Sequence, residues 1–343
     1  MCIYCSIVPS SVLLKLSKDK SLTAEERKGF ADTEKLDVEL RKVRTQARKL
    51  TQVSSALSPA VVGLAGPPTV TVYDCNHSQT LPGSPAANPG SSPDITARQA
   101  FNTTTQVAKF YEDVFARSSV DNAGMTLMSS IHYGTKYNNA FWNGFQMTYG
   151  DGDGNIFIDF SNGNDVIGHE LTHGVTQHSM QLAYANEPGG LNEGMSDIFG
   201  SMFRQWMAKQ DVKSADWLIG KDIMGEGAKS KGYTCLRDMA DPAAAHALAP
   251  QPKHFSKYKK GMDPHESSGI PNFAFYKAAM AIGGNSWEKT GQIWYNSMTR
   301  FAPSPNMKML GFANRTRTVA AQLFSGNATI LGAVDQAWKQ VGL

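Results

Sequence analysis

The sequence has no long hydrophobic run, and this absence excludes one class of protein. None of its 343 residues belongs to a stretch approaching the ~20 consecutive apolar residues that a membrane-spanning helix requires. An apolar patch spans residues 7–16, but Pro9, Ser10 and Ser11 interrupt it, no basic segment precedes it and no small-residue cleavage site follows it. We therefore expect no membrane partner and no ordinary secretion signal.

A strong excess of charge of one sign is also missing. The chain has 33 Lys and Arg residues against 30 Asp and Glu residues, which gives a formal net charge of +3. Nucleic-acid binding usually needs a clustered basic face. One basic cluster, within residues 41–49, fits a solvated helix face, with a protease-sensitive linker as the alternative. We expect no nucleic-acid partner.

Cysteine is scarce, and the four that occur are too unevenly placed for a disulfide framework. They are Cys2, Cys5, Cys75 and Cys235. Cys2 and Cys5 form a Cys-x-x-Cys pair, but no second pair completes a zinc site and no strand-to-helix pattern indicates a thioredoxin motif. We interpret this pair as two thiols in a mobile terminus, and the redox compartment stays open.

The chain divides into a charged helical start, a β-rich middle and a helical second half. Residues 21–50 are typical of an amphipathic helix, and Thr23 with Glu26 can form its capping box. Segments rich in Ser, Pro, Gly and Ala follow at 54–68 and 84–93, which indicates a linker and a domain boundary near residue 60.

Short apolar runs separated by turn residues predict strands between residues 125 and 158. From Asp165 onward the apolar residues recur with helical spacing. The predicted helices span 165–180, 191–209, 271–281, 287–301, 307–324 and 329–341.

The most informative segment is HELTH, residues 169–173, on a predicted helix. Residues four apart lie on one helix face about one turn from each other, so His169 and His173 can converge on one ion. A catalytic zinc site needs three protein ligands and one position for water. Glu193, on the next predicted helix, is the expected third ligand. We therefore expect one Zn²⁺ ion held by His169, His173 and Glu193.

Glu170 follows the first histidine and is the expected general base. Two neutral imidazoles and one carboxylate leave a zinc site with net positive charge, so a zinc-bound water loses its proton near neutral pH, and Glu170 can accept it. Asp197, one turn beyond Glu193, and Asn192 are placed to accept hydrogen bonds from the ligand histidines. A helix whose histidines only cap a core is the alternative.

At this point the sequence resembles the thermolysin-like zinc metalloprotease family, and more narrowly its protealysin-like branch, which carries a short propeptide. The similarity covers most of the chain. Beyond HELTH it includes GGLNEGMSDIFG (189–200), NNAFWNG (138–144), QMTYGDGDG (146–154), LRDM (236–239) and HESSGIPN (265–272). The string CSIVP, residues 5–9, resembles the start of the propeptides in that branch.

The resemblance implies an α+β, two-lobed thermolysin-like fold preceded by a short helical propeptide. Residues 1–60 would be a removable inhibitory propeptide, and residues 61–180 a β-rich N-terminal lobe that includes the HELTH helix. Residues 181–343 would form an α-helical lobe, with the active-site cleft between the two lobes. We expect a zymogen whose own propeptide acts as an intramolecular inhibitor until it is cut away.

By the same resemblance, His265 and Tyr184 would stabilise the oxyanion of a tetrahedral intermediate. Arg237 would bind the substrate carbonyl just past the scissile bond. A structural histidine and a domain-bridging salt link are the alternatives for His265 and Arg237. Asn139 and Ala140 match the positions that bond the substrate backbone.

Three apolar residues match positions that line the pocket after the cleavage point: Phe157, Val166 and Leu236. The resemblance therefore implies cleavage before a bulky hydrophobic residue. Core packing alone would also explain these residues.

The sequence departs from the family near His265. Ser267 stands where the family usually has Asn, and the preceding loop is shortened. Asp263 lies two residues upstream of His265 with Pro264 between them, which leaves open whether it orients the imidazole as the family's Asp does.

A second departure concerns calcium. Asp165 and Asp216 match acidic calcium ligands of the family, but Arg204, Leu218 and Lys221 stand where its other carboxylates would be. A double calcium site cannot form with that charge balance. We expect Arg204 or Lys221 to pair with these aspartates instead.

The sequence thus predicts a zinc-dependent endopeptidase that is made as a zymogen and acts on peptide or protein substrates. The alternatives are a catalytically weakened relative with a binding or regulatory role, and a zinc hydrolase of non-peptide amides. We expect export without an ordinary signal peptide, with a cytoplasmic location as the alternative. A Cys5 thiolate on zinc as an inhibitory fourth ligand is the alternative to an unreactive surface thiol.

Overall fold

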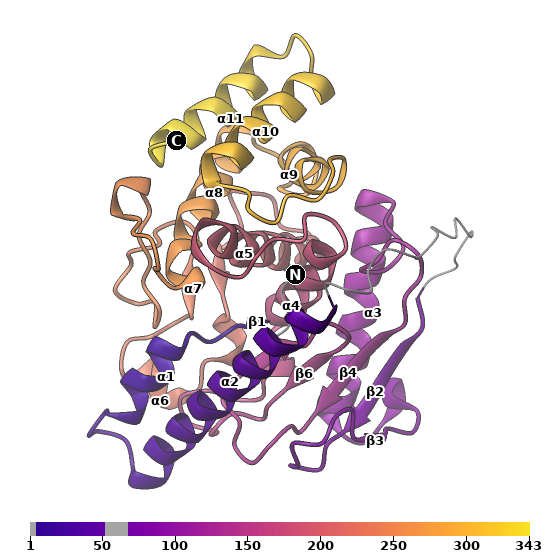
Figure 1. Ribbon diagram of the computed structural model, residues 1–343, viewed down its shortest axis with the longest axis vertical. Coiled ribbons are helices and arrows are strands. Elements are labelled where there is room, and N and C mark those ends of the chain that lie inside the picture. Colours follow the sequence, from indigo (N-terminus) through magenta and orange to yellow (C-terminus); the bar gives the residue numbers. More distant parts are fainter. Residues whose placement is uncertain (1–4, 52–67) are drawn as a thin grey trace.

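The computed structural model describes residues 5–51 and 68–343. The predicted boundary near residue 60 lies outside the described residues, and so does Cys2. Figure 1 shows a sheet in the lower half of the molecule, the helical C-terminal half above it, and two N-terminal helices beside the sheet. The mixed sheet and the helical C-terminal lobe confirm the predicted fold class.

A six-stranded mixed sheet forms the N-terminal lobe, with strand order β1-β5-β6-β4-β2-β3. The β2–β4 and β4–β6 pairs are parallel, and the other three pairs are antiparallel. The strands are β1 (Cys5–Ser6), β2 (Val70–Asp74), β3 (Ser84–Pro85), β4 (Leu127–Ile131), β5 (Ala140–Trp142) and β6 (Met147–Tyr149). The predicted strands of residues 125–158 are β4, β5 and β6.

The sequence did not predict helix α3 (Ile95–Phe115), which packs against β2 and β4. Asp94 caps its N-terminus, because the Asp94 carboxylate accepts a hydrogen bond from the Thr96 backbone N–H at 2.9 Å. Its buried face includes Ala100, Val107 and Phe115, which recur with helical spacing. Consecutive threonines at 103–105 hide this pattern, because β-branched residues lower helix propensity.

The second half contains all six helices predicted from apolar spacing. They are α4 (Asn164–Gln177), α5 (Asn186–Ala208), α8 (Gly269–Ile282), α9 (Lys289–Thr299), α10 (Met309–Leu323) and α11 (Ala328–Gln340). Shorter elements connect them: β7 (Leu218–Ile219), β8 (Arg237–Asp238), α6 (Glu226–Ser230), α7 (Pro264–Ser267), and the 3-10 helices η1 (Pro89–Ser91), η2 (Phe160–Asn162), η3 (Lys221–Ile223) and η4 (Phe255–Lys257).

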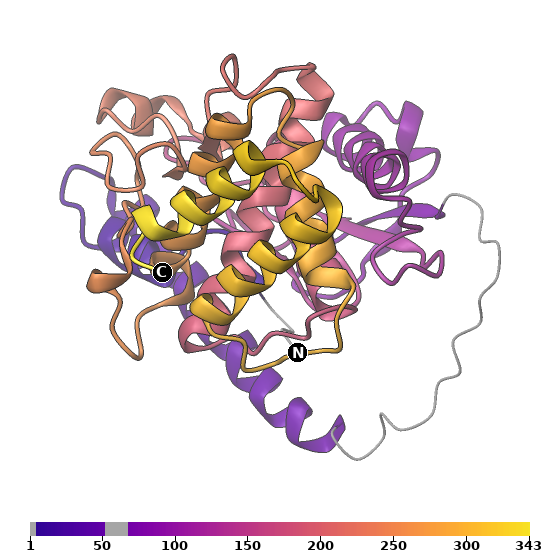
Figure 2. The same cartoon turned by 90° about the horizontal axis from the view of Figure 1, so that it is seen from above.

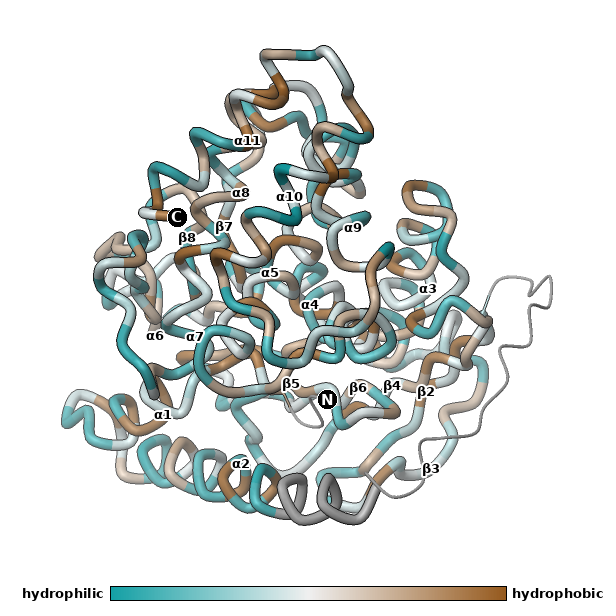
Figure 3. Tube along the Cα trace, turned by 45° about the horizontal axis from the view of Figure 1, so that its top comes forward, coloured by the Kyte–Doolittle hydropathy of each residue, from teal (hydrophilic) through white to brown (hydrophobic). Residues whose placement is uncertain are grey.

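Residues 5–51, here called the N-terminal segment, contain β1, α1 (Ser10–Ser17) and α2 (Ala24–Thr51). The predicted capping box is present: the Thr23 N–H donates to Glu26 Oε2 at 2.6 Å, and the Glu26 N–H donates to Thr23 Oγ1 at 3.2 Å. Figure 3 shows hydrophilic and hydrophobic stretches along α2, as expected of an amphipathic helix. Seen from above in Figure 2, α2 lies at the edge of the molecule.

The helices α4 and α5 cross at close range because two glycines face each other. A Cβ atom added at Gly168 would lie 3.1 Å from the Gly200 Cα, and one added at Gly200 would lie 2.5 Å from the Asp165 carbonyl oxygen. Any larger residue at position 200 would push the helices apart. This contact sets the distance between the side chains that the two helices present to each other.

Candidate metal centre

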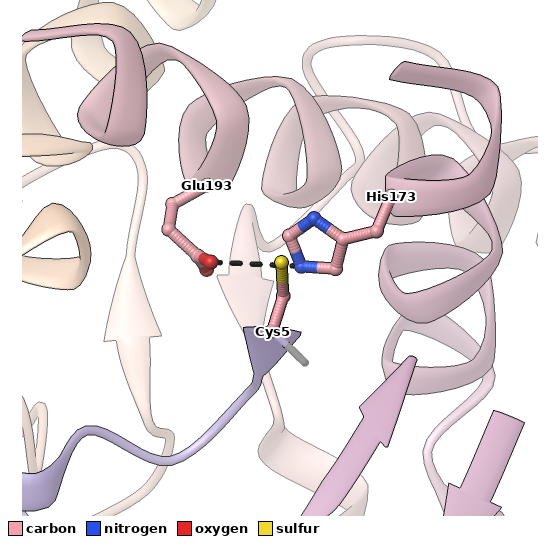
Figure 4. Close-up of side chains that lie close together, drawn as sticks. All are labelled: Cys5, His173 and Glu193. Carbon is pink, nitrogen blue, oxygen red and sulfur yellow. Dashed lines mark ion pairs between the residues drawn. The ribbon is translucent and has the colours of Figure 1, made fainter. Parts of the chain in front are cut away.

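The helix α4 carries the HELTH segment at the middle of the molecule. His169 and His173 are fully buried, and their Nε2 atoms lie 3.1 Å apart. Glu193 reaches them from α5, with Oε2 at 3.4 Å from His169 Nε2 and Oε1 at 3.5 Å from His173 Nε2. The structure therefore brings the three predicted ligands together. Figure 4 shows Glu193 and His173 pointing toward each other from their two helices.

The outer ring nitrogens of both histidines meet oxygen acceptors. His169 Nδ1 lies 2.9 Å from Asp197 Oδ1, and His173 Nδ1 lies 2.9 Å from Asn192 Oδ1. These partners favour the tautomer with the proton on Nδ1, so the Nε2 lone pairs point toward each other. Burial lowers the pKa of His173 to about 3, which keeps its imidazole neutral.

This arrangement fits a metal ion. Burial lowers the pKa of His169, but Asp197 and Glu193 outweigh it and raise that pKa to about 10, so the space between the two Nε2 atoms and the Glu193 carboxylate favours a positive charge. In the part of the chain that the structure describes, buried Glu193 Oε2 has no hydrogen-bond partner, as expected of an atom that a cation would satisfy. Two imidazole nitrogens and one carboxylate are the donor set of a catalytic zinc site.

Arg237 holds Asp197 in place behind His169. Its Nε and Nη2 atoms donate to the two Asp197 oxygens at 2.8 and 2.7 Å, and the Asn272 amide donates to the same carboxylate at 2.8 Å. Burial favours the neutral acid, but Arg237 and His169 outweigh it and hold the pKa of Asp197 at about 2. Asp197 is therefore a permanent anion that fixes the His169 ring.

Glu170 is buried beside these ligands. Within the described residues, neither of its carboxylate oxygens meets a hydrogen-bond partner. Burial raises the pKa of Glu170 to about 8. A divalent cation at His169, His173 and Glu193 would lower that pKa again, because it favours the nearby negative charge.

His265 and Tyr184 lie beside the Glu193 carboxylate, with His265 Nε2 at 3.5 Å from Glu193 Oε2. The Tyr184 hydroxyl donates to Glu193 Oε1 and lies 3.3 Å from His265 Nε2. Asp263 Oδ1 lies 2.8 Å from His265 Nδ1, and it also accepts the His265 backbone N–H at 2.8 Å. The shortened loop therefore still orients the imidazole, because Asp263 caps α7 and bonds the ring. Burial lowers the pKa of His265, but Glu193 and Asp263 outweigh it and raise the pKa.

The residues predicted to bind a substrate backbone bind the N-terminal segment. β1 pairs antiparallel with β5, and the Ile7 N–H donates to the Ala140 carbonyl oxygen at 3.1 Å. Asn139 Oδ1 accepts from the Val8 N–H at 2.9 Å, and Asn139 Nδ2 donates to the Val8 carbonyl oxygen at 3.1 Å.

Two further contacts hold the same stretch. Arg237 Nη1 donates to the Ile7 carbonyl oxygen at 2.8 Å, and His265 Nε2 lies 2.5 Å from the Ser6 carbonyl oxygen. The carbonyl of the Ser6–Ile7 peptide bond therefore lies on His265, and the next carbonyl, that of Ile7, lies on Arg237.

The three residues predicted to line a specificity pocket are fully buried: Phe157, Val166 and Leu236. They belong to the same apolar cluster as Ile7. Phe157 also meets Phe30 of α2 edge to face, with ring centroids 6.3 Å apart. The N-terminal segment contributes seven buried side chains to this cluster: Ile7, Val8, Val12, Leu13, Leu16, Leu22 and Phe30.

Sequence reasoning missed the role of Asp37. This buried residue of α2 accepts hydrogen bonds from the Tyr137 hydroxyl and, at 2.8 Å, from Asn139 Nδ2. Burial raises the pKa of Asp37 to about 6. Phe30, Thr33 and Asp37 recur on one helix face, but two of these residues are polar, so the pattern resembled a solvated face.

The expected unreactive surface thiol at Cys5 is wrong. Cys5 is fully buried, and its Sγ lies with His173 and Glu193 in a group whose ligand atoms are all within 4.8 Å of one another. Figure 4 shows the sulfur between these two side chains. β1 holds the residue there, because Cys5 pairs with Trp142 of β5.

The predicted ion pairs form at the acidic cluster near α5. Arg204 Nη2 lies 2.7 Å from Asp216, and Lys221 Nζ lies 3.0 Å from the same carboxylate. Arg204 Nη1 lies 3.7 Å from Asp165, which is fully buried. Two basic side chains therefore stand against the two aspartates.

In residues 5–51 and 68–343, no helix combines the length and the apolar character that crossing a membrane requires.

Comparisons with known proteins place the chain in one family. A model of the thermolysin metallopeptidase catalytic domain matches residues 46–177, and a model of the thermolysin metallopeptidase α-helical domain matches residues 180–343. An extracellular metalloprotease of Pectobacterium carotovorum is 40% identical over 290 residues, which cover 81% of this chain and 82% of that protein. Thermolysin of Alicyclobacillus acidocaldarius is 37% identical over 80% of this chain and 51% of that protein.

A solved structure agrees with the sequence matches. The precursor of protealysin, a metalloproteinase from Serratia proteamaculans, superimposes with a TM-score of 0.82 at 34% identity and covers 98% of this chain and 99% of that chain. The chain belongs to the thermolysin family of metalloendopeptidases, and its fold is that of the protealysin precursor.

Proposed function

We propose that the chain is a zinc-dependent endopeptidase made as a zymogen, with the N-terminal segment bound in its own substrate site. The observation that carries this proposal is the pairing of Ser6, Ile7 and Val8 along β5. A strand that pairs with a sheet edge is a common way for a peptide to bind. The segment uses the backbone contacts that a substrate would use.

Zinc held by His169, His173 and Glu193 would polarise the substrate carbonyl and lower the pKa of a water molecule. Glu170 takes the proton from that water as it attacks. His265 and Tyr184 donate hydrogen bonds to the oxygen that becomes negative, in place of the Ser6 carbonyl. These groups are fixed before the substrate arrives, which lowers the cost of charge development.

The contacts of the N-terminal segment also indicate how a substrate is positioned and where it is cut. Ser6 presents its carbonyl to His265, and Ile7 presents its carbonyl to Arg237. A substrate bound in the same register would be cut between the residues that replace Ser6 and Ile7. Ile7 lies in the apolar cluster with Val166 and Leu236, which supports cleavage before a bulky hydrophobic residue.

The N-terminal segment acts as the intramolecular inhibitor while it stays in place. It is anchored far from β1 as well, since Lys231 Nζ lies 3.0 Å from Asp19, and Lys136 Nζ lies 2.6 Å from Glu25. Removal of residues 1–60 would release these contacts and open the substrate site. Residues 61–180 and 181–343 would then remain as the two catalytic lobes.

The enzyme is exported in this proposal and needs one zinc ion but no double calcium site. The name of the Pectobacterium relative, an extracellular metalloprotease, supports export. Arg204 and Lys221 already pair with Asp216, so a calcium ion would have to displace these two basic side chains. The weakened-relative alternative depended on a misplaced Asp263, and the 2.8 Å contact between Asp263 and His265 speaks against it.

The test compares wild type, Glu170→Ala and the control Glu226→Ala, whose side chain is 86% exposed. Each is given a quenched peptide with one internal Leu, and mass spectrometry reads each N-terminus. Loss of the base should lower cleavage about 10²- to 10⁴-fold while zinc stays bound. Wild type and Glu226→Ala should lose the N-terminal segment, and Glu170→Ala should keep it.

The proposal fails if all three proteins bind zinc, keep their full length and cut no peptide even after a trans-acting protease removes the N-terminal segment. Equal cleavage by wild type and Glu170→Ala would overturn the assigned base.

A further inference from the structure

The Cys5 sulfur lies beside two of the three predicted metal ligands. It lies within 4.8 Å of ligand atoms of His173 and Glu193, and its residue is fully buried. Pairing of Cys5 with Trp142 and of Ser6 with Phe141 fixes the backbone on both sides of the Cys5–Ser6 bond. A second observation points to the same place, because buried Glu193 Oε2 meets no partner among the described residues.

The sulfur is in an oxidised form in this structure, since Cys5 is disulfide-bonded. A disulfide sulfur carries no negative charge and is a weak donor, whereas a thiolate is among the strongest zinc ligands in proteins. Cys75 and Cys235 are free thiols, but both are buried at other places, and burial raises the pKa of each to about 11 and about 12. Among the cysteines described, Cys5 alone joins a group of possible metal ligands.

We propose that reduction of the Cys5 disulfide turns Cys5 into a fourth ligand of the metal, so that the redox state of this sulfur sets a second level of latency. The inference rests on the proposed zinc site. A dithiol reductant gives two electrons and two protons: the S–S bond breaks, two thiols form, and the reductant becomes a disulfide. The Cys5 thiol then loses its proton to solvent and binds the metal in place of water.

Two contacts would then inhibit the chain, the paired strand and the Cys5 sulfur on the metal, and they are released in different ways. The strand contacts of Ser6, Ile7 and Val8 end only when the segment leaves or is cut. The sulfur contact ends when an extracellular disulfide oxidant takes the two electrons back. In a reducing cytosol both contacts would therefore inhibit the chain. In an oxidising exterior only the paired strand would inhibit it.

The test uses full-length Glu170→Gln protein, which keeps all ligands and the N-terminal segment, with Co²⁺ in place of zinc. A Co²⁺–thiolate bond gives a sulfur-to-metal charge-transfer band in the near ultraviolet that nitrogen and oxygen ligands do not give. The reductant is a phosphine, because dithiols bind metals; it forms a phosphine oxide with oxygen from water. We expect the band to appear on reduction and to vanish on reoxidation.

Two variants in the same background identify the sulfur. Cys5→Ser should bind one Co²⁺ per chain and show no band in either redox state. A Cys75→Ser, Cys235→Ala control should show the band on reduction as the parent does. Circular dichroism checks that each variant is folded, and a second conservative variant, Cys5→Ala, replaces Cys5→Ser if that protein does not fold.

The outcomes separate this inference from the proposed function. One bound Co²⁺ per chain without a charge-transfer band in the reduced parent overturns the inference and leaves the zinc endopeptidase proposal standing. A band that persists in Cys5→Ser also overturns it, because another sulfur then binds. Failure of reduced and oxidised parent alike to bind Co²⁺ or Zn²⁺ overturns the metal site, and the proposed function with it.

Discussion

Asp197 in the metal centre and Asp37 in the N-terminal segment are both buried carboxylates, yet their surroundings shift their pKa values in opposite directions. Arg237 and His169 hold the pKa of Asp197 at about 2, against the effect of burial. Asp37 meets Tyr137 and Asn139, which are neutral, and burial raises its pKa to about 6. Asp197 is held ionised by charged partners and Asp37 is not, which suits a permanent site and a removable inhibitor.

The largest effect that tests this contrast comes from a metal ligand. We expect His173→Ala to lose both zinc and peptide cleavage, because two ligands do not retain the metal, while the N-terminal segment stays uncut. Zinc per chain is measured by atomic absorption, and the N-terminus by mass spectrometry. His246→Ala, whose side chain is 43% exposed, is the control and should keep both properties. Retention of one zinc ion by His173→Ala would contradict the ligand assignment.

The second-largest effect is expected from Asp197, a buried charge that is paired with another buried charge. Asp197→Asn leaves buried Arg237 without its partner, which typically costs about 3–5 kcal/mol in free energy of unfolding. It also loosens the His169 ring, so zinc affinity should fall roughly 10- to 100-fold. Urea unfolding and a competing chelator measure the two effects. Asp335→Asn, which breaks a more exposed pair with Arg317, should change the free energy of unfolding far less. Similar losses in free energy of unfolding in the two variants would contradict the difference that we draw between a buried and an exposed ion pair.

The pKa of Asp37 is raised whereas that of Asp197 is lowered, so Asp37 should stabilise the folded chain at low pH and not at high pH. A carboxyl whose pKa rises from 3.8 when exposed to about 6 when buried stabilises the docked state fully below pH 3.8, and that stabilisation is lost as pH rises through 6. The change is roughly 3 kcal/mol at most. It is the difference in free energy of unfolding between Glu170→Ala and Glu170→Ala, Asp37→Asn, measured by urea between pH 4 and 7.

We expect the parent to lose stability relative to the Asp37→Asn variant between pH 4 and 6, and the difference to level out above pH 6. Arg41 and Glu34 are the charged groups that also act on Asp37, in opposite directions, and both are unchanged in the variant. A difference that does not vary with pH would show that docking does not protonate Asp37.

The smallest effect belongs to the exposed part of the acidic cluster. Lys221→Ala removes one of two partners of Asp216, and both side chains of that pair are largely solvated, so the loss should stay below about 1 kcal/mol. Arg204→Ala should cost more, because it leaves fully buried Asp165 without a cation. Thermal unfolding with and without calcium measures both. A larger loss in Lys221→Ala, or a calcium-induced rise in wild-type Tm, would contradict this view.

Local patterns in the sequence predicted the elements that carry their own periodicity. The ligand helices α4 and α5 follow from the spacing of His169, His173 and Glu193 and from apolar residues recurring every three or four positions. α3 was missed because threonines at 103–105 replace apolar or strongly helical residues. Its formation is decided by tertiary packing on β2 and β4, which a local window does not contain.

The interface of the N-terminal segment could not be predicted in the same way. Val8 and Asn139 are 131 residues apart, and Ser6 and His265 are 259 apart. No periodicity links such positions, so only the family resemblance indicated an inhibitory segment. The bond between Asp263 and His265 is local, but it depends on how α7 is capped, which the sequence left open.

The pairing of β1 with β5 has a further consequence for how the protein behaves in solution. β5 ends one side of the catalytic lobe's sheet, and β1 covers its backbone groups. A chain that has lost the segment would present this strand edge to other chains, and unpaired edges are templates for sheet-to-sheet aggregation. The same short strand that blocks catalysis would therefore keep newly made chains from sticking to one another while they are concentrated in the cell that produces them.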